Sequence, residues 1–371
     1  MKTVIEFITI LVDGGSQVVV KNYVETINRN DVSLMVLTVF PHKTSAVQRA
    51  IVQMGIPVIS LYPRYNLFFR AVNRIFSKQI TSFLLLRKIQ RVQPYAIHVH
   101  APLLKLLEPI RDSIKNIKLF YTCHSLPQVY FSGRNEIEKR AAKHLICDNG
   151  LQIFALHKEM ADELNRLLNI NNTIVLNNGI NIERYKYVKE SKREIRESLN
   201  ILPDTYVVGH VGRFDKIKNQ MFLIDIFIQL LRYRDAHLIL VGDGEDGPLF
   251  SKIKKKIEKV GLQKKVTILT HRNDVHRLLK AFDIFIFPSL YEGFGLALLE
   301  AQAAGLRCVI SDTISDVTRV LDSTVGVSLN KPAEYWCNTV LDEDIRQPHT
   351  STLEDYDIFK IIKRLQRYYL G

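Results

Sequence analysis

The feature that most constrains this chain of 371 residues is its alternation of short apolar segments with longer amphipathic ones. The short segments are rich in Val, Ile, Leu and Phe, and several end in Gly, Pro or His, as buried strands do. The longer segments have helical spacing. Strands that alternate with helices along a chain favour parallel sheets with right-handed crossovers. We therefore expect an α/β protein built on parallel sheets.

The expected elements fall into two groups, as in a protein with two domains. In the first group we expect strands at 4–12, 33–40, 96–99 and 118–122, and helices at 17–28 and 68–91. In the second group we expect strands at 206–211, 237–241, 266–269, 284–287 and 308–311, and helices at 222–233, 249–260, 275–281 and 295–305. The predicted domains are 1–177 and 178–350, followed by a helix within 351–371 that packs on either domain.

Positive charge is concentrated in the first half of the chain. Residues 1–180 carry 22 Lys and Arg against 12 Asp and Glu, whereas the remaining residues carry 29 against 26. No acidic residue occurs between Asp31 and Glu108. Such a window favours a polyanion or an anionic membrane surface as partner, although a solvated basic surface without a partner is the alternative.

The segment 68–91 within this window is predicted to be amphipathic. Its large apolar residues cluster on one helical face, and its basic residues recur every four positions on the other. We expect the apolar face to pack on the sheet and the basic stripe to attract anionic lipid; an exposed apolar face would instead insert into the membrane. The apolar residues are Phe68, Val72, Ile75, Phe76 and Phe83, and the basic residues are Arg70, Arg74 and Lys78.

The cysteines and the apolar segments point to a reducing, cytoplasmic compartment. Cys123, Cys147, Cys308 and Cys337 lack metal-ligand spacing, and we expect free thiols. The longest apolar stretches are shorter than the roughly 20 residues of a membrane-spanning helix. The N-terminal segment, in which Glu6 interrupts the apolar run, is typical of a first strand and not of a signal peptide.

Candidate ligand-binding residues follow the predicted strands of the second half, where parallel sheets bind ligands. After 284–287, glycines at 293 and 295 flank Phe294 at a predicted helix start, so that amides there can approach an anion. Glu292 and Glu300 are eight residues apart, about 80° around a helix, and can face one site. Carboxylates accept hydrogen bonds from vicinal hydroxyls, so the segment predicts a ligand with phosphate and sugar groups.

Two further segments supply glycines and positive charge at neighbouring strand ends. Gly212 permits close approach of a ligand, and Arg213 and Lys218 could clasp a diphosphate. Gly242 begins a Gly-Asp-Gly turn after the strand at 237–241. Each segment alone is also compatible with an ordinary surface turn.

In the first half, Gly15 lies where the first strand enters a helix, and His124 follows the strand at 118–122. The Gly14-Gly15 turn lacks the third glycine of the dinucleotide fingerprint, so it is weak evidence for a nicotinamide dehydrogenase. A single histidine is more often structural than functional.

Taken in order, these motifs resemble the retaining glycosyltransferases of family 4. The resemblance rests on Gly212-Arg213 with Lys218, Gly242-Asp243-Gly244, Pro288-Ser289 with Glu292-Gly293-Phe294-Gly295, Glu300 with Ala304-Gly305, and the turn Asn178-Gly179-Ile180. It implies the GT-B fold, in which two Rossmann-like domains with parallel sheets face each other across a cleft. Within the family the chain looks most like bacterial capsule and exopolysaccharide enzymes.

The resemblance also implies roles for individual residues. Arg213 and Lys218 would neutralise the departing diphosphate, and Glu300 would hold the ribose hydroxyls. Glu292 and the amides of Phe294 and Gly295 would contact the donor. Gly212, Gly242 and, from the first domain, Gly15 would lie by the donor phosphates, while His124 would face the reacting sugar.

The expected reaction transfers a hexose or N-acetylhexosamine, with retention, from a UDP-sugar to a lipid-linked saccharide at the inner face of the cell membrane. We expect no cofactor and no obligatory metal, because no Asp-x-Asp motif follows a strand in the second half. The alternatives are a nucleotide-sugar epimerase and, in another class, a basic nucleic-acid-binding protein. The second is disfavoured because no recognition-helix, zinc or single-strand-binding motif is present, so we expect no nucleic-acid partner.

Overall fold

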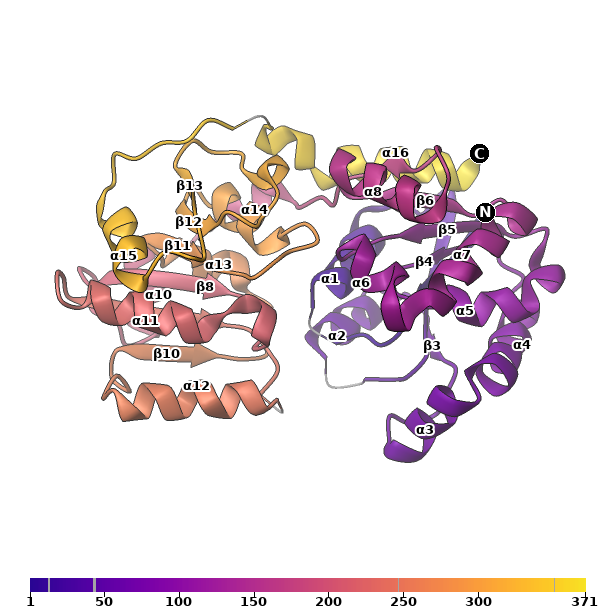
Figure 1. Ribbon diagram of the computed structural model, residues 1–371, viewed down its shortest axis with the longest axis horizontal. Helices are drawn as coiled ribbons and strands as arrows, with labels where there is room; N and C mark the ends of the chain where they lie inside the picture. Colours follow the sequence, from indigo (N-terminus) through magenta and orange to yellow (C-terminus); the bar gives the residue numbers. More distant parts are fainter. Residues whose placement is uncertain (13, 43–44, 246, 350) are drawn as a thin grey trace. The chain divides into compact units, whose positions relative to one another are not determined.

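The computed structural model describes residues 1–12, 14–42, 45–245, 247–349 and 351–371, and these divide into two compact units (Figure 1). The first unit comprises Met1–Gly179 and Ile358–Gly371, and the second comprises Ile180–Asp357. The last helix, α16 (Ile358–Leu370), therefore belongs to the first unit, where it packs against α1 (Gly15–Thr26).

The first unit contains a seven-stranded parallel sheet in the order β3-β2-β1-β4-β5-β6-β7. The strand β1 pairs Glu6 with Val36 of β2 on one side and with His98 of β4 on the other. The strands are β1 (Lys2–Ile8), β2 (Val32–Thr38), β3 (Val58–Ser60), β4 (Ala96–Val99), β5 (Lys118–Thr122), β6 (Gln152–Ala155) and β7 (Ile174–Val175). Besides α1 and α16, its helices include α2 (Ala46–Gln53), α3 (Leu67–Ile75), α4 (Ser82–Val92), α5 (Leu104–Leu107), α6 (Pro127–Phe131), α7 (Glu136–Asn149) and α8 (Lys158–Leu168).

The second unit contains a six-stranded parallel sheet in the order β10-β9-β8-β11-β12-β13. The strands are β8 (Tyr206–Val211), β9 (Ala236–Val241), β10 (Val266–Leu269), β11 (Ile284–Phe287), β12 (Arg307–Ser311) and β13 (Thr324–Val327). Helices α11 (Gln220–Leu230), α12 (Pro248–Lys259) and α15 (Ala333–Leu341) contribute to one buried cluster, and α10 (Lys192–Ser198), α13 (Val275–Lys280) and α14 (Leu296–Ala303) contribute to another. The two clusters contain alternate residues of the same strands and so lie on opposite faces of the sheet, which gives this unit three layers of helices, sheet and helices.

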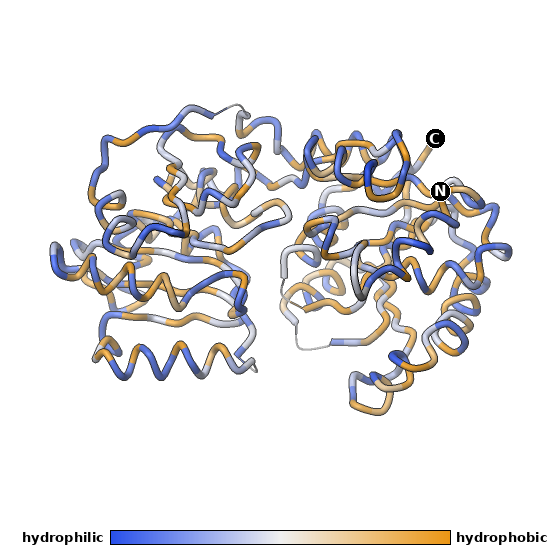
Figure 2. Tube along the Cα trace, viewed as in Figure 1, coloured by the Kyte–Doolittle hydropathy of each residue, from blue (hydrophilic) through white to orange (hydrophobic). Residues whose placement is uncertain are grey.

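The expected α/β class with parallel sheets is confirmed, and every strand expected from the sequence is present. Figure 2 shows the apolar character of the strands in both units. The four strands that were not expected, β3, β6, β7 and β13, have only two to four residues each. β3 and β7, with three and two residues, are too short for a periodic pattern to stand out.

The expectation that the apolar face of 68–91 packs on the sheet is wrong. This segment is not one helix but α3, a π-helical turn η1 (Ser77–Thr81) and α4. The ring of Phe69 contacts that of Tyr62, with centroids 5.3 Å apart. The residue that packs α3 on the unit is therefore Phe69, the neighbour of Phe68 on the predicted apolar face. Phe68 and Ile75 consequently remain 67% exposed.

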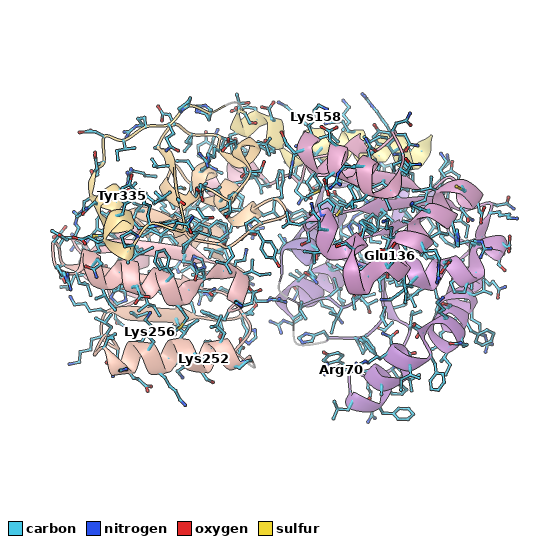
Figure 3. All side chains as sticks on the ribbon, in the orientation of Figure 1. Arg70, Glu136, Lys158, Lys252, Lys256 and Tyr335 are labelled. Carbon is cyan, nitrogen blue, oxygen red and sulfur yellow. The ribbon has the colours of Figure 1, made fainter. Side chains whose placement is uncertain are left out.

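Basic side chains share the exposed surface of this segment. Arg70, Arg74 and Lys78 are all exposed, and Arg70 is labelled on α3 in Figure 3. α3 has no buried residue. In the part of the chain that the structure describes, no helix combines the length and apolarity that crossing a membrane requires.

The strand that leads into the candidate site is fixed by a close contact in the core. β8 lies between β9 and β11, and a Cβ atom on Gly209 would lie 1.8 Å from Cδ2 of the Phe282 ring. Phe282 is itself buried. Only glycine therefore allows the ring to lie against β8 at this point, and the packing sets the position of the strand.

We predict that Gly209→Ala destabilises the second unit by about 1–3 kcal/mol, because the added methyl group must displace a buried aromatic ring. Urea denaturation monitored by circular dichroism measures the change. Adding Phe282→Leu, which removes ring atoms from the contact, should recover part of the loss. An unchanged free energy of unfolding for Gly209→Ala would contradict this account of how β8 is positioned.

Candidate active site

The carboxyl ends of the neighbouring strands β8 and β9 in the second unit meet at two glycines. Gly212 follows β8 and Gly242 follows β9. A Cβ atom on Gly242 would lie 2.1 Å from the carbonyl oxygen of Gly212, and one on Gly212 would lie 3.2 Å from the side chain of Lys218. The structure thus brings Gly212, Gly242 and Lys218 together, and the backbone of Gly212 leaves no room for a side chain at Gly242.

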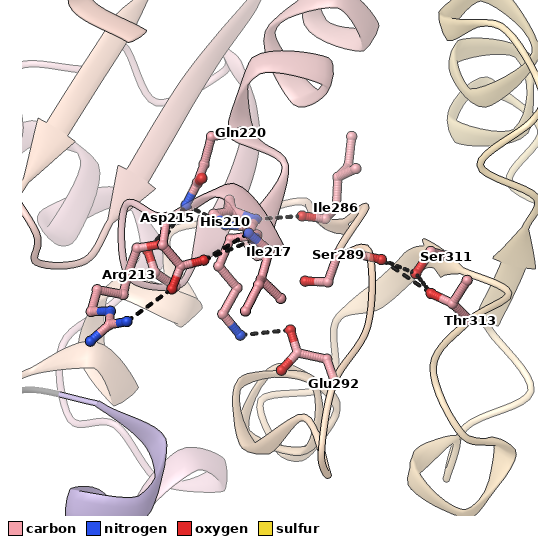
Figure 4. A network of polar contacts seen from close by, with 12 residues as sticks. His210, Arg213, Asp215, Ile217, Gln220, Ile286, Ser289, Glu292, Ser311 and Thr313 are labelled. Atoms are coloured by element: carbon pink, nitrogen blue, oxygen red, sulfur yellow. Dashed lines mark hydrogen bonds and ion pairs between the residues drawn. The ribbon is translucent and has the colours of Figure 1, made fainter. Parts of the chain in front are cut away.

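Lys218 is held at this strand end by a capped turn and an ion pair. The carboxylate of Asp215 accepts hydrogen bonds from the amides of Ile217, at 2.9 Å, and Lys218, at 3.2 Å, at the start of η4 (Lys216–Lys218). The Lys218 ammonium donates to Oε1 of Glu292 at 2.6 Å (Figure 4). The two side chains are 19% and 11% exposed, so the pair is partly shielded from water and its attraction is stronger than at an open surface.

Arg213 lies at the same strand end but is less confined. Its guanidinium donates to Oδ2 of Asp215 at 3.2 Å, and half of the side chain is exposed. Because this contact is exposed, it contributes little to stability and leaves the guanidinium able to reorient. Arg213 can therefore supply a mobile positive charge beside the fixed one of Lys218.

The loop after β11 is fastened to the turn that carries Lys218. The amide of Leu290 donates to the carbonyl of Ile217 at 2.7 Å, and the side chain of Asn219 donates to the carbonyl of Pro288 at 3.1 Å. These bonds fix the loop that carries Glu292. The site therefore holds the Glu292 carboxylate and the Lys218 ammonium in a defined arrangement without a ligand.

The start of α14 follows this loop. Gly295 caps the helix with φ of +82°, a conformation that favours glycine. The Phe294 ring is buried and packs edge-on against Tyr356 with centroids 5.6 Å apart. A ligand contact from Phe294 would therefore come from its amide, as the sequence predicts, because the ring is part of the core.

Glu300 lies in α14 and has a partner that no motif had indicated. Its Oε1 accepts a hydrogen bond from the Tyr185 hydroxyl at 2.8 Å. Tyr185 belongs to α9 (Ile182–Lys186), which packs against α14. The hydroxyl orients the carboxylate, which can still accept further hydrogen bonds.

Two buried polar residues lie beside the Gly212-Arg213 segment and were not predicted from the sequence. Gln220 donates to the carbonyl of Arg213 at 2.8 Å, and Nδ1 of His210 lies 2.9 Å from the carbonyl of Ile286. Burial lowers the pKa of His210 to about 4, so its ring is neutral at neutral pH. His210 lies within β8 and Gln220 at the first position of α11, where no sequence pattern distinguishes them from core residues.

The remaining two candidates lie in the first unit. Gly15 is the exposed first residue of α1. His124 follows β5, and its Nε2 lies 2.9 Å from Nδ1 of His100. Burial and the neighbouring His100 hold the pKa of His124 well below its ordinary value, so the ring is neutral.

All four cysteines are free thiols, as expected from the sequence.

Comparison with known proteins identifies the family. Residues 13–184 match the family described as Glycosyltransferase Family 4, and residues 191–334 match that described as Glycosyl transferases group 1. EpsF of Bacillus subtilis (strain 168), which is named as a glycosyltransferase, is 31% identical over 228 residues, covering 59% of this chain and 58% of EpsF.

A second relative is the Escherichia coli enzyme named UDP-Gal:alpha-D-GlcNAc-diphosphoundecaprenol alpha-1,3-galactosyltransferase. It is 33% identical over 143 residues, which cover 37% of this chain and 36% of that protein. The matched regions thus span less than two thirds of either relative.

The fold is shared along the full length with a solved structure. Anabaena HepE, in the complex with UDP-glucose, superposes with a TM-score of 0.77 at 18% identity and covers 99% of both chains. From the two family matches and the two parallel sheets, the chain belongs to glycosyltransferase family 4, the group 1 glycosyl transferases, and has the GT-B fold.

Proposed function

We propose that the protein is a retaining glycosyltransferase that transfers a hexose or N-acetylhexosamine from a UDP-sugar to a lipid-linked saccharide in capsule or exopolysaccharide biosynthesis. The observation that carries the proposal is the ion pair of Lys218 and Glu292 at the carboxyl ends of β8 and β11. It combines a cation for a diphosphate with a carboxylate for sugar hydroxyls. The names of the relatives, with UDP-galactose, a diphosphoundecaprenol acceptor and UDP-glucose, support this choice of donor and acceptor.

Stabilising the departing diphosphate is the main physical task of such a reaction. Fixed positive groups aimed at developing charge act strongly in a site that excludes water. Without donor, the carboxylate of Glu292 neutralises the Lys218 ammonium; a donor phosphate would compete for this ammonium and release Glu292 toward the sugar. Arg213 would add a second charge from the exposed side of the same turn.

The other candidate residues complete the donor site in this proposal. Glu300, already oriented by Tyr185, would accept hydrogen bonds from the ribose hydroxyls. Gly212, Gly242 and Gly295 would let the backbone approach the phosphates. From the first unit, Gly15 would approach the phosphates and His124 would face the reacting sugar. Since side chains neutralise the diphosphate, the proposed reaction needs no metal.

We predict that Lys218→Ala lowers kcat about 10²–10³-fold at saturating UDP-sugar, because a charge that stabilises the leaving group is lost. Arg213→Ala should also lower kcat. Product formation followed by mass spectrometry measures both. If these variants raise only the KM for the donor, the two side chains bind donor without stabilising its departure, and the assignment fails.

The same assay tests the reaction class. A panel of UDP-sugars is incubated with and without lipid-linked saccharides, and the masses of sugar nucleotide and acceptor are followed. Transfer that depends on the acceptor supports the proposal. Conversion of the nucleotide sugar without an acceptor would instead indicate an epimerase on this fold.

We also propose that the protein works in the cytoplasm, at the inner face of the membrane, and reaches its acceptor by docking α3 and η1 on anionic lipid. Large apolar residues and exposed cations lie together on this segment, and no acidic residue occurs from 32 to 107 to repel lipid head groups. Because the apolar side chains are exposed, docking would combine partial insertion with electrostatic attraction. The exposed apolar residues of the segment are Leu67, Phe68, Ile75, Phe76 and Ile80.

Flotation with liposomes tests this docking. We predict binding to liposomes that contain phosphatidylglycerol, with part of the binding retained in high salt because buried apolar surface is insensitive to screening. Phe68→Ser with Ile75→Ser should abolish the retained part. Leu202→Ser, at an apolar position of the second unit that is 74% exposed, is the matched control and should bind as the wild type does. No binding of the wild type at low salt would end the membrane proposal.

A further inference from the structure

A buried polar network lies in the first unit and includes residues that no motif had marked. Glu6 of β1, His98 of β4 and Tyr369 of α16 have no exposed surface, and His100, just beyond β4, is nearly as buried. β1 and β4 are paired strands, with Glu6 directly beside His98. The network therefore joins the centre of the sheet to the end of the chain through Tyr369.

One branch of the network leads from Glu6 to His124. Nε2 of His100 lies 2.6 Å from Oε2 of Glu6, and Nδ1 of His100 lies 2.9 Å from Nε2 of His124. The His100 and His124 rings are stacked, with centroids 5.2 Å apart. The two imidazoles thus connect the buried carboxylate of Glu6 to the candidate site residue.

A carboxylate only accepts hydrogen bonds, and with a neutral His100 ring this fixes the proton positions along the branch. The proton of a neutral His100 ring must lie on Nε2, facing Glu6, which leaves a lone pair on Nδ1. His124 must then donate from Nε2. A neutral imidazole carries one proton, so Nδ1 of His124 is left bare, as a hydrogen-bond acceptor.

The second branch satisfies the remaining groups. The Tyr369 hydroxyl donates to Oε1 of Glu6 at 2.9 Å, and therefore accepts from Nδ1 of His98, at 2.6 Å. Nε2 of His98 lies 2.7 Å from the Thr122 hydroxyl, which donates to it. Both oxygens of Glu6 and all four nitrogens of His98 and His100 thus have partners, and a metal ion would have to displace these bonds.

Nδ1 of His124 is the exception. Within the described residues it is buried and has no hydrogen-bond partner. A buried acceptor without a partner costs free energy that a hydroxyl group of a bound ligand would recover. The branch therefore ends in an acceptor that lacks a donor.

We infer that Glu6 and His100 are positioning residues that hold His124 in the Nε2–H tautomer, so that its Nδ1 accepts a hydrogen bond from a hydroxyl of the transferred sugar or of the saccharide acceptor. The inference rests on the proposed function for the identity of the hydroxyl, but the tautomer follows from the network with a neutral His100 ring. Glu6 and His100 act through His124 and need not touch a substrate.

Long-range ¹H–¹⁵N correlation spectra of the full chain labelled with [¹⁵N]histidine report the tautomer directly at neutral pH. The His124 signals are assigned by their loss in His124→Gln. We expect a protonated Nε2 and a bare Nδ1 in the wild type. A proton on Nδ1 of His124 overturns the inference, whatever the activity of the enzyme.

Two variants test whether Glu6 sets the tautomer of His124. In Glu6→Gln the carboxamide can donate as well as accept, so the ring of His124 should lose its single tautomer. Tyr369→Phe is the matched control, because it removes a buried hydroxyl bonded to Glu6 but leaves the branch to His124 intact; the tautomer should persist. A single, unchanged tautomer of His124 in Glu6→Gln would show that Glu6 does not set it. If that variant does not fold, His100→Gln, which breaks the same branch, replaces it.

Kinetics then separate this inference from the proposed function. Glu6→Gln should lower kcat/KM roughly 3- to 10-fold, the loss expected for one neutral hydrogen bond, and His124→Ala should lower it at least as much. Altered tautomers with unchanged kcat/KM in Glu6→Gln would overturn the positioning role. Absence of sugar transfer by the wild type would overturn the proposed function, while the spectra would still decide the tautomer.

Discussion

The pairing of Lys218 with Glu292 is the interaction on which the donor site depends. The rest of the site holds this pair in place: Asp215 caps the turn that carries Lys218, and Leu290 and Asn219 fasten the loop that carries Glu292. The Lys218 ammonium and the Glu292 carboxylate attract each other strongly because they are only partly exposed. A ligand that separates them must therefore supply each with a new partner. A diphosphate with a sugar attached supplies both partners at once, an anion for the lysine and hydroxyl groups for the carboxylate.

Both units build their candidate sites by the same means. Side chains emerge where parallel strands end, and buried polar groups behind them fix their orientation. In the second unit Gln220 bonds the Arg213 carbonyl and His210 lies beside the Ile286 carbonyl of β11, and in the first the carboxylate of Glu6 directs the protons of two imidazoles. The supporting groups are deeply buried, so they hold the neighbouring backbone and side chains in place before a ligand binds.

The central strands of both sheets and the residues that follow them are predictable from the sequence, because strand alternation and glycine turns are local signals. Partners that tertiary structure brings together leave no such signal, as with Tyr185 for Glu300 or Tyr369 for Glu6, which is 363 positions away. The packing of the apolar face of 68–91 is likewise not predictable from its spacing. Amphipathic spacing shows that a face exists, whereas the anchoring of α3 through Phe69 decides which face is packed.

Calorimetric titration with UDP tests the central claim most directly, since UDP carries the diphosphate without the sugar. The account predicts that Lys218→Ala weakens UDP binding about 10- to 100-fold, the loss of one charge-assisted contact. It also predicts that Glu292→Gln strengthens binding, because the lysine is no longer neutralised. Unchanged affinity for UDP in Lys218→Ala, with the fold intact, would contradict the claim that this ion pair marks the diphosphate site.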